Sequence, residues 1–365
     1  MSEGLCPQCR EPLTAGAAFC EACGAAVMAA TGGASAPGAP PQSDPLDERA
    51  PISASTRPAR PAPAAVPAGP RPCAECGGEV GEDLYCTTCG AKAPSARDHF
   101  EEAPAGWVAG VCDRGVRHSR NEDAMALAAS DTPGEHAVLV VCDGVSTSKD
   151  SDVASMAAVR AALEVLRAPL PAGLGVSESA DAAADQVFTR AAAAANTAVI
   201  AHSDPSSPNP ASCTFVAAVL AGALLRYAHL GDSRAYYLPD DGEGRQLTLD
   251  DSMAQMLMAG GMPRAEAESS PQAHSITRWL GTDAEGVVPT VGRTEVTAKG
   301  WILVCSDGLW NYASEPAALR EQIRAVGSSD PLTITQALVE WAKAQGGHDN
   351  ITAALARVEG GTADG

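Results

Sequence analysis

The sequence has no apolar run long enough to cross a membrane. The longest, roughly residues 213–225, contains Ala221-Gly222 where a turn fits, and a spanning helix needs about 20 apolar residues. Residues 1–8 also lack the basic region followed by an apolar one that marks a signal peptide. We therefore expect a soluble, cytoplasmic protein without membrane contact.

Basic residues are scarce as well. The 365 residues include 25 Lys and Arg against 45 Asp and Glu, a formal net charge of −20. Residues 1–103 hold 7 Lys and Arg against 13 Asp and Glu, with no basic cluster. This balance argues against a nucleic-acid partner and is compatible with cation binding. The length allows two or three domains.

Eight of the 12 cysteines form four Cys-x-x-Cys pairs. The pairs are Cys6 and Cys9, Cys20 and Cys23, Cys73 and Cys76, and Cys86 and Cys89. Two such pairs supply four thiolates to one tetrahedral Zn²⁺, so we expect two structural zinc ions. The alternative is a disulfide framework, which the missing secretion signal disfavours. The other four cysteines lie in or beside apolar runs, and we interpret them as small buried hydrophobic residues: Cys112, Cys142, Cys213 and Cys305.

The cysteine pairs and the composition divide the chain. We expect zinc ribbons at residues 1–27 and 73–92, and between them a disordered linker, residues 28–72, rich in Pro, Ala, Gly and Ser. Residues 93–105 form a second linker in this division, 106–358 the catalytic domain and 359–365 a flexible tail. Whether the two ribbons dock on one another stays open.

Four aspartates stand at the edges of apolar, strand-like runs: Asp143, Asp232, Asp307 and Asp349. Mg²⁺ and Mn²⁺ take oxygen ligands, so carboxylates gathered at strand edges suggest a site for a hard cation. For any single Asp-Gly pair, the alternative is an ordinary turn.

Seven short motifs follow one another along the chain. They are Asn121-Glu-Asp123, Asp143-Gly144, Ser212-Cys-Thr214, Gly231-Asp-Ser-Arg234, Ile276-Thr-Arg278 with Leu280-Gly281, Cys305-Ser-Asp-Gly308 and Asp349-Asn-Ile-Thr352. In this order and spacing they make residues 113–349 resemble the metal-dependent protein serine/threonine phosphatases of the 2C type, the PPM phosphatases. The resemblance implies an α+β fold, a central β-sandwich flanked by helix pairs, here preceded by the two zinc ribbons.

Periodicity fits such a layered domain. Apolar residues at helical spacing predict helices over residues 151–167, 178–202, 315–326 and 332–345. Residues 214–220 and 224–230 read as a strand pair, and residues 351–358 as a final strand.

The resemblance also implies a role for each matching residue. Asp143 would bridge two Mn²⁺ or Mg²⁺ ions, the Gly144 carbonyl would bind one of them, and Asp307 and Asp349 the other. Glu122 and Asp123 would support the pair, and Asp232 would bind a third, weaker ion. Two such cations lower the pKa of a shared water and neutralise phosphoryl oxygens during in-line attack. The segment 253–275 matches a mobile flap that we expect to select substrates.

Two positions depart from the family pattern. Residues 145–149 read Val-Ser-Thr-Ser-Lys where Met-Gly-Gly is frequent after Asp-Gly. Five residues before Asp123, where a phosphate-holding Arg is usual, stands His118, preceded by Arg117. We expect His118 to hold the phosphate, with Arg117 as the alternative.

The resulting hypothesis is a monomeric protein phosphatase whose substrates are phosphoproteins of a serine/threonine kinase pathway, with the zinc ribbons as a docking or regulatory module. A rival from another class is a phosphatase-fold protein that binds phosphoproteins without hydrolysing them. A third, in which the ribbons bind nucleic acid, is weakened by the composition.

Overall fold

The computed structural model describes residues 72–73, 76–81, 84–91, 93, 95–171 and 177–360. The first predicted ribbon, with Cys6, Cys9, Cys20 and Cys23, lies outside these residues, as do nearly all of the predicted linker 28–72 and residues 361–365. The described chain forms two units, one before Ser95 and one from Ser95 onward. Within the described residues, no helix combines the length and apolarity that a membrane span requires.

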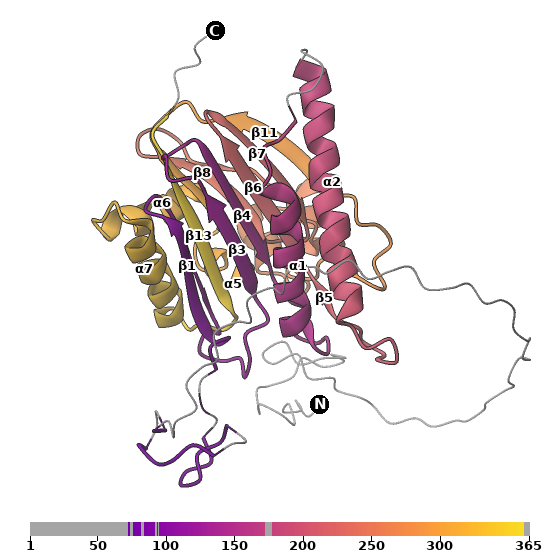
Figure 1. Ribbon diagram of the computed structural model, residues 1–365, viewed down its shortest axis with the longest axis vertical. Helices are drawn as coiled ribbons and strands as arrows, with labels where there is room; N and C mark the ends of the chain where they lie inside the picture. Colours follow the sequence, from indigo (N-terminus) through magenta and orange to yellow (C-terminus); the bar gives the residue numbers. More distant parts are fainter. Residues whose placement is uncertain are drawn as a thin grey trace, which may run out of the picture. The chain divides into compact units, whose positions relative to one another are not determined.

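The unit from Ser95 is built on two antiparallel sheets (Figure 1). The six-stranded sheet has the order β1 (His99–Ala105), β2 (Val108–Asp113), β13 (Ile351–Val358), β12 (Gly300–Cys305), β8 (Arg234–Pro239) and β9 (Arg245–Gln246). The five-stranded sheet has the order β11 (Thr290–Glu295), β7 (Leu224–Leu230), β6 (Phe215–Ala221), β4 (His136–Cys142) and β3 (Ala124–Ala129). A short pair, β10 (Leu280–Gly281) and β5 (Ser212–Cys213), lies apart from both.

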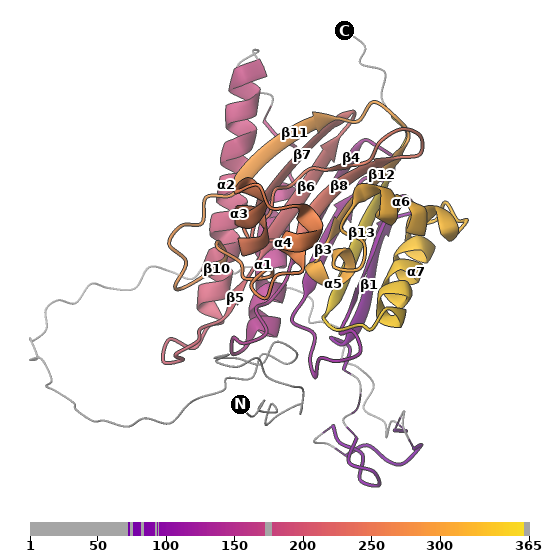
Figure 2. The same ribbon diagram turned by 180° about the vertical axis from the view of Figure 1, so that it is seen from behind.

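Helices cover the outer faces of both sheets (Figures 1 and 2). The long pair α1 (Ser151–Leu166) and α2 (Ser177–Ala201) packs on the five-stranded sheet. Helices α5 (Asp307–Trp310), α6 (Pro316–Ala325) and α7 (Pro331–Ala344) pack on the six-stranded sheet. Two short helices, α3 (Met253–Ala259) and α4 (Arg264–Glu268), lie in the predicted flap around a small apolar cluster. The α+β sandwich flanked by helix pairs, expected from the sequence, is therefore confirmed.

The central strands are apolar on both faces because each face meets a different layer. In β4, Val138, Val140 and Cys142 pack against α1 and α2, whereas the alternate residues Leu139 and Val141 pack between the sheets. Successive side chains of a strand point to opposite faces, so a strand covered on both sides reads as a continuous apolar run. This explains why the run that leads to Asp143 shows no alternation in the sequence.

One predicted boundary is wrong. The sequence assigned residues 93–105 to a linker, but His99–Ala105 form strand β1, which pairs with β2 along most of its length. The strand is polar because it lies at the sheet edge, where one side faces solvent. Phe100 and Ala105 still pack against the core between the sheets, and Glu102 accepts a hydrogen bond from the Leu127 amide at 2.7 Å. The domain therefore begins before Gly106.

Candidate active site

Strand register brings the predicted carboxylates together at one end of the sandwich. Cys142 at the end of β4 pairs with Ala124 at the start of β3, which places Asp143 beside Asp123. In the other sheet, Cys305 at the end of β12 pairs with both Arg234 and Ala353. Asp307, Asp232 and Asp349 adjoin these three positions. The predicted ligands thus lie next to strand ends at the same end of both sheets.

Hydrogen bonds at Asp123 connect the two sheets. Its Oδ2 accepts from the hydroxyls of Ser306 at 2.6 Å and Thr352 at 2.7 Å. Thr352 lies in β13 of the other sheet, and Ser306 directly follows β12. The amide of the next carboxylate, Glu122, donates to the Asn350 side chain at 2.7 Å. Gly308 allows the same approach, since a Cβ there would overlap the carbonyl oxygen of Asn350. Hydrogen bonds with Ser306, Thr352 and Asn350 therefore fix the positions of Asp123 and Glu122.

The carboxylates raise one another's pKa. Burial, followed by the charge of Asp123, raises the pKa of Asp307 to about 6. Burial also raises the pKa of Asp123 to about 6, and burial with the charge of Asp307 raises that of Asp349 to about 6. The pKa of Asp143 rises well above its ordinary value through burial and then the charges of Asp123 and Asp307. A cation bound beside them would favour the ionised forms of these carboxylates.

Three carboxylate oxygens of this group are buried and have no hydrogen-bond partner among the described residues. They are Oε2 of Glu122, Oδ1 of Asp123 and Oδ1 of Asp307. Buried polar atoms normally have partners, and divalent cations such as Mn²⁺ and Mg²⁺ bind carboxylate oxygens. The residues present therefore fit the metal ions that the sequence motifs imply.

His118 lies against two of these acids. Its ring nitrogens are each 3.4 Å from a carboxylate oxygen, Nδ1 from Oε2 of Glu122 and Nε2 from Oδ1 of Asp349. Burial alone would lower the pKa of His118, but the close contact with Glu122 and the charge of Asp349 outweigh it and raise that pKa. Arg117 is exposed and lies beside it. Both side chains border the carboxylates, so both predicted phosphate-holding residues lie at the site.

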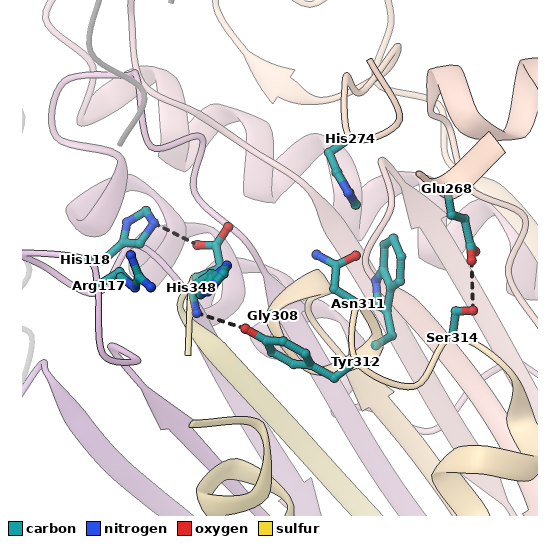
Figure 3. Close-up of a pocket in the computed structure, with 11 residues that line it drawn as sticks. Arg117, His118, Glu268, His274, Gly308, Asn311, Tyr312, Ser314 and His348 are labelled. Carbon is teal, nitrogen blue, oxygen red and sulfur yellow. Dashed lines mark hydrogen bonds and ion pairs between the residues drawn. The ribbon is translucent and has the colours of Figure 1, made fainter. Parts of the chain in front are cut away.

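A cavity of about 410 Å³ opens over this group (Figure 3). Arg117, His118 and Asp349 line one side, and Trp310 and Tyr312 lie beyond them. The flap supplies Glu268 and His274. The cavity is large enough for a phosphorylated side chain, and its wall combines cations with the edge of the carboxylate group.

Several residues of the site were missed by the sequence reasoning. Arg234 is buried, pairs with Asp250 at 2.7 Å and stacks on the Trp310 ring at 3.4 Å from its centroid. Trp310 in turn donates from Nε1 to the Asp232 carbonyl at 2.9 Å, which fixes the loop that carries this predicted ligand. Arg234, Ser306, Asn350 and Thr352 belong to motifs noted above, and that membership was the available signal. No pattern in the sequence indicated that His274 lies at the site.

The second predicted zinc site is well formed. The sulfur atoms of Cys73, Cys76, Cys86 and Cys89 all lie within 4.8 Å of one another. The amides of Gly78 and Thr88 donate to Cys76 and Cys86, each at 3.4 Å. Positive φ angles at Gly77 and Gly90 make the turns after the cysteines. Four converging thiols on two such turns suit one tetrahedral Zn²⁺.

The other cysteines behave as small apolar residues. Cys112, Cys142, Cys213 and Cys305 are all fully buried. Burial raises the pKa of Cys112 to about 12 and that of Cys142 well above its ordinary value. A buried thiol that resists ionisation is a poor nucleophile.

Residues 114–343 match the family model described as Protein phosphatase 2C. The chain belongs to the protein phosphatase 2C family. Residues 6–100 match the model described as Double zinc ribbon, which agrees with the cysteine pairs in front of the phosphatase domain.

Similar proteins support the same family. PstP, a serine/threonine protein phosphatase of Mycobacterium tuberculosis, is 33% identical over 249 residues, 67% of this chain but 44% of PstP. The serine/threonine phosphatase Stp of Listeria innocua is 29% identical over 252 residues, 67% of this chain and 92% of Stp. A solved structure of the PstP catalytic domain with two manganese ions has a TM-score of 0.51 and 28% identity, and the match covers 69% of this chain and 97% of that one. The phosphatase domain thus spans under half the length of PstP and nearly all of Stp.

Proposed function

We propose that this chain hydrolyses phosphoserine and phosphothreonine in proteins at a binuclear Mn²⁺ or Mg²⁺ centre. The observation that carries the proposal is the group of Asp123, Asp143, Asp307 and Asp349, whose pKa values are raised together. Oδ1 of Asp123 and Oδ1 of Asp307 are buried without a hydrogen-bond partner among the described residues, and Asp349 lines the cavity. The two manganese ions bound by the PstP catalytic domain support the same choice of metal.

In this proposal the role of each residue follows from the sheet beside which it lies. Asp143 and the Gly144 carbonyl hold the metals from the five-stranded sheet, and Asp307 and Asp349 hold them from the six-stranded sheet. Glu122 and Asp123 support these ligands, and Asp232 binds a third ion. When bound, the metal ions supply a water of lowered pKa and neutralise phosphoryl oxygens.

The phosphate is held on the cavity wall. His118 lies with both nitrogens toward ligand carboxylates and brings positive charge next to the place where a phosphate would bind. Arg117, exposed on the same wall, adds a permanent charge at longer reach. The protein itself provides no nucleophile in this scheme.

The ribbons carry a separate role. One Zn²⁺ for each set of four cysteines would hold them folded, and a unit with so few apolar residues suits docking or regulation rather than catalysis. The sulfur geometry of Cys73, Cys76, Cys86 and Cys89 supports the second of these two zinc ions.

The test is the full chain, treated with EDTA and then supplied with Mn²⁺, assayed on an aryl phosphate and on a phosphothreonine peptide. We expect turnover only with added metal. Asp307→Asn should lower it at least about a hundredfold with the fold intact, because metal activation supplies several kcal/mol of transition-state stabilisation. Metal-independent hydrolysis, or a fully active Asp307→Asn variant, would contradict the mechanism.

A second candidate is a protein that binds phosphoproteins without hydrolysing them. It is favoured by His118 in place of the usual arginine and by the altered loop 145–149, in which Ser148 bonds to Ser212 at 3.0 Å. The same assay separates the two, since this candidate predicts that the phosphothreonine peptide binds in the presence of Mn²⁺ and is recovered unchanged.

A further inference from the structure

His274 lies in the flap, between α4 and β10, and points into the cavity toward Asn311 (Figure 3). One of its ring nitrogens and one carboxylate oxygen each from Asp232 and Asp307 all lie within 4.8 Å of one another. Ligand atoms about 2.1 Å from one ion are separated by roughly 3 to 4.2 Å. A small inward movement of these three groups would therefore let them bind one ion.

The two carboxylates lack a cationic partner. Asp307 is 9% exposed, and its Oδ1 has no hydrogen-bond partner among the described residues. Asp232 is 4% exposed, and in the described part of the chain neither aspartate forms an ion pair. The nearby Arg234 directs its charge to Asp250 and Glu268 instead. One buried oxygen of this pair, Oδ1 of Asp307, is thus left without a hydrogen-bond partner, and neither acid is in an ion pair in the described part of the chain.

His274 is exposed, and among the described residues its ring has a packing partner but no hydrogen-bond partner. It packs against Trp310, with ring centroids 6.0 Å apart, and Trp310 is fixed by Arg234 and by the Asp232 carbonyl. The loop that carries it is tied to α3 by the bond from the Ala254 amide to the Ala273 carbonyl at 3.2 Å. The ring nitrogens are therefore available on a side chain whose direction is set.

We infer that His274 joins Asp232 and Asp307 as the third protein ligand of a divalent transition-metal ion, with Mn²⁺ favoured over Mg²⁺. The inference rests on the proposed function, because it shares Asp307 with the binuclear centre. Mg²⁺ takes oxygen ligands almost exclusively, whereas imidazole suits transition metals. An ion held by one flap residue and two core residues also ties the flap to the core.

The test uses the full, zinc-loaded chain titrated with Mn²⁺ and with Mg²⁺, followed by electron spin resonance and isothermal titration. In the wild type, we expect nitrogen coupling on the Mn²⁺ that binds last. His274→Ala should abolish that coupling and weaken this Mn²⁺ at least about tenfold, with Mg²⁺ binding changed little. His274→Asp should restore Mn²⁺ without nitrogen coupling and improve Mg²⁺. The matched control is His202→Ala, an exposed histidine after α2.

The outcomes separate the inference from the proposed function. If His274→Ala keeps the nitrogen coupling and the weakest Mn²⁺ affinity while turnover still depends on Mn²⁺, the inference is overturned and the binuclear centre stands. If the wild type binds no Mn²⁺ and hydrolyses nothing, both fail.

Discussion

The carboxylates of the phosphatase domain lie at strand ends inside a packed sandwich, whereas the cysteines from Cys73 to Cys89 lie on two short turns. Among the described residues before Ser95, Ala93 is the one buried apolar residue besides Cys73 and Cys86. Asp123 is completely buried, while Cys76 and Cys89 are exposed. In the first region the fold holds the ligands close together against their mutual repulsion. In the second, little except the metal can hold the ligands together. Metal removal should therefore cost activity in one region and structure in the other.

The largest effects come from breaking each site separately. Asp143→Asn should lower turnover on an aryl phosphate at least about a hundredfold, since the proposed metal centre would lose a ligand. Its metal-free melting temperature should not fall, because the amide removes a charge that its neighbours repel.

Cys86→Ser should lower bound zinc by about one equivalent per chain and speed amide exchange over residues 72–93, with turnover changed less than about twofold. Kinetics, zinc analysis and calorimetry measure these changes.

Two control variants test whether the effects at the carboxylates and at the cysteines are specific. Asp131→Asn changes an exposed aspartate in a turn and should leave turnover and melting unchanged. Thr88→Ser, placed between two zinc ligands, should keep the zinc. Loss of aryl phosphatase activity in Cys86→Ser would mean that the ribbon belongs to the active site and that the division is wrong.

The next effect is a pH dependence of the metal-free phosphatase domain. Asp123, Asp307 and Asp349 have folded-state pKa values of about 6 against an ordinary 3.8, so between these values the folded chain binds more protons than the unfolded one. The stability they contribute therefore falls as the pH rises from about 4 through 6. Mn²⁺ offsets the repulsion of the ionised form, so it should raise the melting temperature more at about pH 7.5 than at about pH 5. An equal rise at both pH values would contradict the charged, folded site.

The smallest effect concerns the cavity wall. His118→Ala should lower kcat/KM about tenfold, the usual cost of losing a hydrogen bond to a charged group, and Arg117→Ala should lower it less. His118→Arg should restore turnover, because a guanidinium keeps its charge at any assay pH. Kinetics of the three variants with saturating Mn²⁺ decide between them. If Arg117→Ala is the damaging change and His118→Ala is silent, the phosphate is held one residue earlier.

The sequence predicted the layers well where burial forces a pattern. The helices predicted at residues 151–167 and 178–202 and the strand predicted at 351–358 agree with α1, α2 and β13 within a residue or so. Strand β1 was missed because its sequence, His-Phe-Glu-Glu-Ala-Pro-Ala, has a single large apolar residue, and only its pairing with β2 makes it a strand. Edge strands take their stability from partners that lie elsewhere in the chain.

The aspartates that we propose as metal ligands were also within reach of the sequence, because each follows or precedes a short apolar run in a family motif. The groups that orient them were not. Arg234 stacks on Trp310, 76 positions later, and no local pattern indicates that contact. His274 stands in a loop without periodicity, and only the fold brings it to Asp232. Long-range side-chain contacts of this kind depend on tertiary packing.

Arg97 sets a limit on how far a protease could shorten this protein from its N-terminal side and still leave an intact enzyme. Its guanidinium donates to the backbone carbonyl of Asp123 and to Ser155 Oγ at 3.4 Å, and its own carbonyl accepts from Asn121 at 3.1 Å. Cleavage just before Ser95 would release the ribbons and keep these bonds. Cleavage a few residues later would remove Arg97 and these hydrogen bonds, together with part of β1. The buried Asp123 would then lose this support. An active proteolytic fragment should therefore begin at or before Ser95.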